Sequence, residues 1–348
     1  MPRSRSPHVA FDFLELWVRD LASTARILTT QFGFETSKTL AERRPDEATA
    51  SFTCGDVAVV VRQGTSSANA VARHVAKHGE GVGDIALVSD DIGSIAERAL
   101  AHGLKASIDG ECVHVDVLGD QTILHTVRQR KDSPVSESGM NRELLRMPGV
   151  DHVTYCLPFG TIERVAQCYR EVFALEGVEV EQGGDIGDDN NGMRSMVLRS
   201  PRGFTVVLTE PMSATGWGQT QHFLRSHAGA GVQHVAIAYD DLITTVHTLR
   251  SRGVPFLPVP QEHLERSHDR LRNHALPWSE LRREGILVDA DQTGLLFQLF
   301  TGPLTAGGSF FFEFIQRAGA TGFGAANIRG LFAALDVSMP RDQVKESV

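Results

Sequence analysis

The chain has 348 residues, 41% hydrophobic and 22% charged, which is enough for two globular domains of ordinary size. A formal net charge of −9 without a basic stripe argues against a nucleic-acid-binding surface. No apolar run approaches the length of a membrane span, and the first residues carry two arginines but no apolar core of a secretory signal.

Four cysteines are spread along the chain at Cys54, Cys112, Cys156 and Cys168, without the close pairs of a zinc site or the pattern of a disulfide framework. Reduced thiols are typical of a reducing compartment. We therefore expect a cytoplasmic protein with neither a membrane nor a nucleic acid as partner.

The first part of the chain predicts alternating short strands and helices. Apolar alternation predicts the strands, and Gly-Asp or Asp-Asp pairs mark their ends. The expected elements are a strand at 11–18, a helix at 20–32, two strands within 48–62, a polar helix near 66–78, a strand from 81 with a helix after it, and a hairpin at 112–130.

A polar stretch at 131–149, with Pro and Ser, predicts a linker between a first domain of residues 1–130 and a second of residues 150–348. After it the pattern restarts. The expected elements are a strand at 150–157, a helix at 161–173, two strands within 193–209, a strand from 231 with a helix after it, an irregular surface excursion at 254–285, and closing strands at 294–301 and 309–317.

An internal repeat connects the two parts. The run GVGDIALVSDD at 81–91 returns as GVQHVAIAYDD at 231–241, an offset of 150 residues. In both copies a short strand precedes an Asp pair that predicts a helix N-cap. The sequence thus predicts an α+β fold built from β-α-β-β-β units, in two tandem domains.

Comparing the two parts isolates three polar positions on three separate strands. The second part carries His152, His234 and Glu313, and we align them with Phe13, Asp84 and His125 of the first. This comparison predicts that the second half carries side chains able to ligate a metal ion and that the first half does not.

Two histidines and one carboxylate are the ligand set of non-haem Fe(II) oxygenases, which leaves positions open on the metal. With neutral imidazoles such a site has a net charge of about +1 and suits an anionic chelating substrate. For His234 alone, the competing interpretation is a buried histidine satisfied by a carbonyl group. For Glu313 it is a solvent-facing strand residue between buried Phe312 and Phe314.

At DHV (151–153), GVQHVAI (231–237) and FFEFIQR (311–317) the chain resembles the 4-hydroxyphenylpyruvate dioxygenase family of the vicinal-oxygen-chelate fold. The run GFGAANIRGLF at 322–332 resembles that family's closing helix. The resemblance implies two half-open mixed β-barrels, the second with Fe(II) held by His152, His234 and Glu313 and closed by a C-terminal helix. It also implies a small 2-oxo acid and O₂ as substrates, and it allows a homo-oligomer.

The resemblance further implies a set of substrate-binding positions around the metal. These are Ser195, Val207, Thr209, Gln219, Gln233, Gln298, Phe323, Asn327 and Ile328. A helix at 325–336 would place Ile328, Leu331, Phe332 and Leu335 on one apolar face that covers the pocket mouth.

The family has a dioxygenase branch, which forms homogentisate, and a 4-hydroxymandelate synthase branch. Where the first has Pro-x-Asn-Glu-Pro, this chain has Val207 and Thr209, and where it has Asn-Phe, this chain has Asn327-Ile328. The synthase branch is similar at the Ile and likewise lacks the Asn, whereas Phe332 matches the dioxygenase. We expect 4-hydroxymandelate as the product. Homogentisate formation, as in tyrosine catabolism, is the alternative, and an extradiol catechol dioxygenase or a metal-free binding protein of the same fold is more remote.

Overall fold

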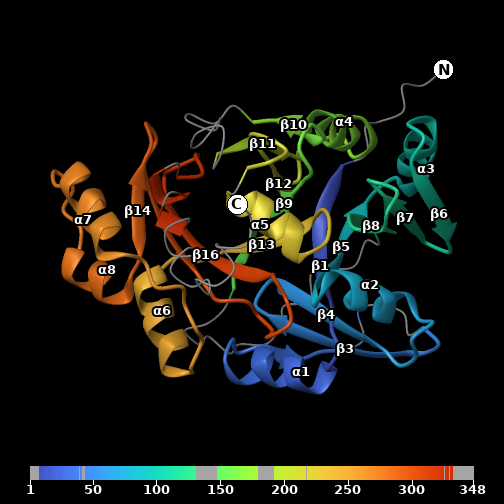
Figure 1. The fold of residues 1–348 in the computed structure, drawn as a ribbon, viewed down its shortest axis with the longest axis horizontal. Coiled ribbons are helices and arrows are strands. Elements are labelled where there is room, and N and C mark those ends of the chain that lie inside the picture. Colours follow the sequence, from blue (N-terminus) through green and yellow to red (C-terminus); the bar gives the residue numbers. More distant parts are fainter. Residues whose placement is uncertain are drawn as a thin grey trace.

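Two mixed β-sheets, one from each half of the chain, form the frame of the molecule (Figure 1). A computed structural model describes residues 8–38, 40, 44–130, 147–178, 192–216, 218–324, 326–328 and 330–331. The first sheet consists of β1 (Val9–Trp17), β2 (Glu35–Thr36), β3 (Glu47–Cys54), β4 (Val57–Gly64), β5 (Gly81–Ser89), β6 (Lys105–Asp109), β7 (Cys112–Asp116) and β8 (Leu124–Gln129).

The second sheet repeats the first strand for strand. Its strands are β9 (Gly149–Cys156), β10 (Glu176–Gly177), β11 (Met193–Arg199), β12 (Thr205–Pro211), β13 (Gly231–Ala238), β14 (Leu287–Ala290), β15 (Leu295–Phe300) and β16 (Phe311–Ala318). The spatial orders are β2-β3-β4-β1-β5-β8-β7-β6 and β10-β11-β12-β9-β13-β16-β15-β14. Both orders are the same, which confirms the tandem duplication.

Each sheet mixes strand directions in the same way. β1 runs parallel to β4 and antiparallel to β5, and β5 runs parallel to β8. β9, β12, β13 and β16 repeat this arrangement. The outermost strands of each sheet do not pair with each other, so neither sheet closes into a barrel. The predicted α+β class with two half-open units is confirmed.

Helices connect the strands. They are α1 (Leu21–Thr30), α2 (Ala70–His78), α3 (Ile92–Ala101), α4 (Ile162–Val172), α5 (Gln219–Ser226), α6 (Leu242–Ser251), α7 (Gln261–Arg270) and α8 (Trp278–Glu284). Of these, α1, α2, α3 and α6 start at a capping Asp or Asn side chain. Asp91 accepts a hydrogen bond from the backbone N–H of Ser94 at 2.9 Å, and Asp241 accepts one from that of Thr244 at 3.1 Å. The repeated Asp pair is therefore an N-cap signal in both copies, as expected.

The prediction of an irregular excursion at 254–285 is wrong, because this stretch contains α7 and α8, which lie beside β14 at the edge of the second sheet (Figure 1). Pro260 and Pro277 stand at the N-caps of these helices, where a missing N–H costs nothing. The sequence pattern also missed the edge strands β6 and β14.

The outer faces of the two sheets share one apolar core. Alternation sends Val153, Val235, Phe312 and Phe314 to that face, and all four are fully buried. Phe32, just after α1, lies edge-on to Phe312 with ring centroids 5.4 Å apart, so the segment that follows α1 in the first half packs against the sheet of the second. The opposite, inner face of the second sheet is thereby left for polar side chains.

Two expected segments fall partly outside the described residues. Of the linker 131–149, only 147–149 are described, and the Met147 carbonyl accepts a hydrogen bond from the N–H of Asp56 at 2.8 Å. Of the closing helix 325–336, residues 326–328 and 330–331 are helical, while Phe332 and Leu335 lie beyond the described part. Among the described helices, none has both the length and the hydropathy that a bilayer crossing requires.

Candidate metal centre

Three neighbouring strands bring His152, His234 and Glu313 to one point on the inner face of the second sheet. β13 pairs with β9 on one side and with β16 on the other. His152 is 3% exposed, His234 7% and Glu313 2%. Phe312 and Phe314 are buried on the outer face, yet Glu313 between them is buried too, so it is not a solvent-facing strand residue.

The ligand atoms of these three residues converge. Nε2 of His152 lies 3.4 Å from Oε2 of Glu313, and Nε2 of His234 lies 3.3 Å from the same oxygen. One potential ligand atom from each residue lies within 4.8 Å of the others, the single such group in the searched part of the chain. Neighbouring ligands about 2.1 Å from an ion, at right angles, would lie about 3.0 Å apart. A divalent cation therefore fits this donor set.

The rings of both histidines are oriented by hydrogen bonds on their far nitrogens. Nδ1 of His152 bonds to Oδ1 of Asp151 at 2.8 Å, and Nδ1 of His234 bonds to Oε1 of Gln233 at 3.0 Å. Each acceptor keeps the proton on Nδ1, so that Nε2 of each ring presents a lone pair to the shared point. Gln233, expected to bind substrate, here supports a ligand.

The carboxylate is held by a second series of hydrogen bonds. Nε2 of Gln298 donates to Oε1 of Glu313 at 2.7 Å, and Nδ2 of Asn327 donates to Oε1 of Gln298 at 2.8 Å. Asn327 is fully buried, and its Oδ1 has no hydrogen-bond partner within the described residues. A Cβ at Gly324 would lie 2.4 Å from Oε1 of Gln298, so the loop approaches this amide closely.

Burial and mutual attraction oppose each other in the electrostatics of the cluster. Burial acts to lower the pKa of His152, but the Glu313 carboxylate and Asp151 outweigh it and raise that pKa to about 9. Burial acts to raise the pKa of Glu313, and His152 and His234 overcome it and hold that pKa below its usual value. Burial dominates at His234, whose pKa is lowered. Glu313 thus remains an anion poised for a cation.

Aromatic and apolar side chains form a wall beside His234. The Phe311 ring stacks on the imidazole with centroids 5.1 Å apart, and the Phe300 ring lies edge-on at 6.4 Å. Both belong to an apolar cluster with Leu331 of the C-terminal segment. The sequence reasoning missed Phe300 and Phe311, although their spacing of two from Gln298 and Glu313 places them on the same face.

The remaining expected pocket residues lie on neighbouring elements. Ser195 on β11 is paired with Thr209 on β12, and Val207 is buried two residues before Thr209. Oγ1 of Thr209 donates to the carbonyl of Tyr155 at 2.9 Å. The hydroxyl is therefore bound to the backbone of β9.

Gln219 starts α5, where its Nε2 lies 3.5 Å from the carbonyl of Leu331, and Ile328 is half-buried on the C-terminal segment. A cavity of about 540 Å³ is lined in part by Gln219, Gln233 and Phe311, but the three candidate ligands and the other expected pocket residues do not line it. The Phe323 ring lies edge-on to His152 at 5.1 Å.

The first half carries a different set at the equivalent positions, and the alignment of His125 with Glu313 is wrong. Leu87 pairs with Val127, and Ile237 pairs with Phe314, so Thr126 is the counterpart of Glu313. His125 points into the shared core instead, where Nε2 bonds to the hydroxyl of Tyr169 at 2.8 Å. A register difference of one residue exchanges the faces of a strand.

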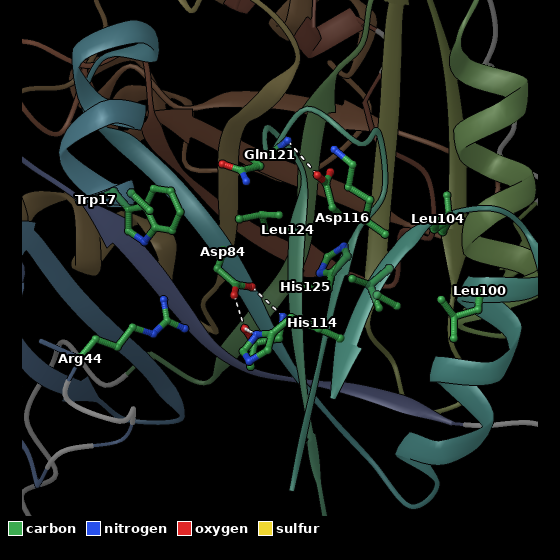
Figure 2. A pocket seen from close by; sticks show the side chains of 16 residues that line it. Trp17, Arg44, Asp84, Leu100, Leu104, His114, Asp116, Gln121, Leu124 and His125 are labelled. Carbon is green, nitrogen blue, oxygen red and sulfur yellow. Dashed lines mark hydrogen bonds between the residues drawn. The ribbon is translucent and has the colours of Figure 1, made fainter. Parts of the chain in front are cut away.

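Asp84, at the place of His234, is held by hydrogen bonds within its own half. Its Oδ1 accepts from the N–H of Thr126 at 2.9 Å, its Oδ2 accepts from the Thr126 hydroxyl, and His114 Nδ1 bonds to that hydroxyl at 2.9 Å (Figure 2). Burial and the Glu15 carboxylate raise the pKa of Asp84. A cavity of about 510 Å³ lies over this face. The counterpart of His152 is Phe13, whose side chain offers no ligand atom.

Comparisons with known proteins agree with this geometry. The family model described as the Glyoxalase/Bleomycin resistance protein/Dioxygenase superfamily matches residues 6–111 and 149–269. The chain is 31% identical over 291 residues to 4-hydroxyphenylpyruvate dioxygenase of Legionella pneumophila, with 78% of each chain covered. It is 30% identical over 288 residues to that of Sus scrofa, covering 76% of this chain and 73% of the relative. A solved triple mutant of 4-hydroxymandelate synthase from Streptomyces coelicolor superposes with a TM-score of 0.80 at 30% identity, covering 94% of this chain and 98% of that one.

Proposed function

The chain belongs to the glyoxalase/bleomycin resistance protein/dioxygenase superfamily and, within it, to the family of 4-hydroxyphenylpyruvate dioxygenase and 4-hydroxymandelate synthase, and we propose that it converts 4-hydroxyphenylpyruvate and O₂ to 4-hydroxymandelate and CO₂. It is a non-haem dioxygenase that acts on a small molecule. The proposed reaction balances: one oxygen atom enters the carboxylate that decarboxylation leaves, and the other enters the benzylic carbon.

The proposed cofactor is Fe(II), held by His152, His234 and Glu313. Two imidazoles and one carboxylate with open positions are typical of non-haem Fe(II) oxygenases. When bound, the ion supplies the site where a 2-oxo acid chelates and O₂ is reduced. The residues of the chain do the rest: Asp151 and Gln233 fix the two imidazoles, and Gln298 fixes the carboxylate.

We propose different roles for the two duplicated domains. Residues 1–130 form a structural domain that binds no metal, residues 131–149 a linker, and residues 150–348 the catalytic domain. The counterpart positions Phe13 and Thr126 support this division, because neither a phenyl ring nor a hydroxyl bound to Asp84 replaces a ligand of the second half.

The hydrogen bond of Thr209 is the observation that carries the choice of product. An amide at this position would have two donors and an acceptor to offer to the aromatic ring or its hydroxyl group. Thr209 has one hydroxyl, and that hydroxyl donates to the Tyr155 carbonyl. The Thr209 hydroxyl is therefore not available as a donor to a substrate ring. Without this attachment the ring is free to turn so that the benzylic carbon is attacked.

Ile328 acts in the same direction. An isoleucine in place of a phenylalanine on the closing segment removes one aromatic wall, and Phe311 and Phe300 then provide the aromatic surface beside His234. The buried Oδ1 of Asn327 offers an acceptor for the phenol hydroxyl of the substrate. A difference of about 1.4 kcal/mol between the two barriers suffices for a tenfold product bias.

The direct test is product identification from 4-hydroxyphenylpyruvate with Fe(II) and O₂. Hydroxymandelate and homogentisate are isomers, so chromatographic retention and NMR must be used in addition to mass. We expect CO₂ release with hydroxymandelate as the main product. Homogentisate as the main product would refute this assignment in favour of the dioxygenase reaction. Absence of CO₂ release would instead favour an extradiol dioxygenase or a metal-free binding protein.

Substitutions at the two pocket positions test the physical argument. Thr209→Asn combined with Ile328→Phe should move the product toward homogentisate, because it restores the amide and the aromatic wall. Thr209→Ser is the matched control: it keeps the hydroxyl that reaches Tyr155 and should keep hydroxymandelate. Equal product ratios in all three proteins would show that these positions do not select the product.

A further inference from the structure

Arg317 binds the support of a metal ligand and the loop that follows its own strand. It lies on β16, four residues after Glu313. Its Nε contacts Oδ2 of Asp151 at 2.7 Å and its Nη2 contacts Oδ1 at 2.9 Å, a two-point ion pair. The same Oδ1 bonds to Nδ1 of His152 at 2.8 Å. The guanidinium is therefore one carboxylate away from a ligand imidazole.

A β-bulge makes this contact possible. Ala236 pairs with His152 and Ile237 pairs with Val150, so Asp151 is an extra residue without a partner on β13. Side chains of neighbouring strand residues normally point to opposite faces, whereas a bulge redirects one of them. Here it allows Asp151 to reach the ring of the residue next to it.

The other side of the guanidinium holds the segment 319–323. Nη1 of Arg317 donates to the carbonyl of Gly322 at 2.6 Å and to that of Ala320 at 3.3 Å. Its Cζ lies 5.0 Å from the centroid of the Phe323 ring, and that ring lies edge-on to His152 at 5.1 Å. Arg317 thus connects the loop and the imidazole by two routes, through Asp151 and through Phe323.

We propose that Arg317 is a positioning residue that couples the docking of segment 319–323 to the orientation of His152, so that metal binding and loop docking stabilise each other. The inference rests on the proposed metal site. A ligand-supporting hydrogen bond typically changes metal affinity by about 10–100-fold when it is lost. By linkage, whatever the loop contributes to metal binding, the metal contributes equally to loop docking.

The first half contains a similar aspartate–arginine pair without a metal ligand, although its Arg128 stands at the position of Ile315, two residues before that of Arg317. Phe11 pairs with Leu87 and Phe13 with Ala86, so Asp12 is also a bulged residue. Nε of Arg128 bonds to Oδ2 of Asp12 at 2.6 Å, and its Cζ lies 5.2 Å from the Phe13 ring. Nη1 of Arg128 donates to the carbonyl of Leu40 at 2.9 Å. An aspartate–arginine pair at a bulge is thus a structural feature of both copies, and only in the second does it touch a histidine.

The experiment uses Co(II) as the probe, because its absorption spectrum reports ligation and it can be titrated into metal-free protein. Arg317→Lys keeps the charge but cannot span Asp151 and two carbonyls at once. We expect it to weaken Co(II) binding by about 10–100-fold. In the unmodified protein Co(II) should slow amide hydrogen exchange at residues 319–324, and in Arg317→Lys this protection should be lost.

Two further variants keep the result interpretable. Arg128→Lys makes the same change in the first half and should leave both Co(II) affinity and protection unchanged. Asp151→Asn retains an acceptor for His152 while removing the ion pair, so it tests the coupling if Arg317→Lys does not fold. Unchanged affinity and protection in a folded Arg317→Lys or Asp151→Asn protein would overturn this inference alone. Failure of the unmodified protein to bind Co(II) would overturn the metal site and the inference together.

Discussion

Three imidazoles meet where the helices α2 and α5 bring the two halves together, and two of them, His74 and His227, make stability sensitive to acid. The rings of His74 and His78 on α2 lie 4.7 Å apart, and that of His227, directly after α5, lies 5.0 Å from His78. Trp17 lies edge-on to His74, and Phe223 stacks on His227. His74 and His227 are less than 9% exposed, so protonation of either would place a charge in an aromatic cluster.

Burial lowers the pKa of His74 to about 3 and that of His227 to about 4. Lys77 and His78 add repulsion at His74, while Asp120 partly compensates at His227. Since the unfolded chain binds these protons near pH 6.5, it holds more protons than the folded one below that pH. The stability of the folded state is therefore complete above about pH 6.5 and falls as the pH decreases toward 4. At pH 5 the loss is about 2 kcal/mol for His74 and about as much for His227, from about 1.5 pH units at 1.36 kcal/mol each.

The assay is urea denaturation of metal-free protein at pH 8 and pH 5, because bound metal would add its own pH dependence. His74→Gln removes one titrating group, so the variant should lose about 2 kcal/mol less than the unmodified protein between these pH values. His274→Gln, at an exposed side chain, is the matched control and should reproduce the profile of the unmodified protein. Parallel pH profiles for His74→Gln and the unmodified protein would refute the reasoning.

Three further outcomes follow from the proposed site. His234→Ala should abolish turnover and stoichiometric iron binding while the circular dichroism spectrum persists, and full activity would rule out this ligand. Asp84→Ala should leave the iron content unchanged, and loss of iron there would place the metal in the other half. Gly324→Ala should weaken metal binding because its Cβ would lie 2.4 Å from Oε1 of Gln298, measured by titration of metal-free protein. Gly103→Ala, with a similar positive φ of 71° but open space around it, is the control and should lower stability alone.

Strand alternation, the internal repeat and the family resemblance together predicted the three converging ligands. His152, His234 and Glu313 each occupy a strand whose neighbouring residues belong to the buried outer face, and a two-residue period leaves them only the inner face. The repeat then identified which half differs. What alternation could not supply is the register between halves, because His125 and Thr126 are adjacent and both lie in an apolar run. Only the pairing of Leu87 with Val127 decides between them.

Two of the residues that support the site, Asp151 and Arg317, could not be predicted for a related reason. Asp151 and Arg317 are 166 positions apart, and no local sequence pattern around either residue indicates their ion pair. The bulge at Asp151 breaks the alternation rule that located His152 beside it. Likewise, the prolines before α7 and α8 stand in a charged stretch, where they are as typical of loops as of helix starts.

In this duplicated scaffold, the residues that stabilise the fold differ from the residues that form the candidate metal site. Both halves keep an aspartate–arginine pair at the bulge and an apolar outer face, so these features serve the fold wherever they occur. The halves differ at three inner-face positions, where side chains can change without disturbing the core that the outer face builds. A change of Phe, Asp and Thr to His, His and Glu at these positions replaces an internally bonded network by a convergent donor set. Asp12 pairs with an arginine at the bulge of the first half. Asp151 does the same in the second half and also accepts a hydrogen bond from the imidazole of His152.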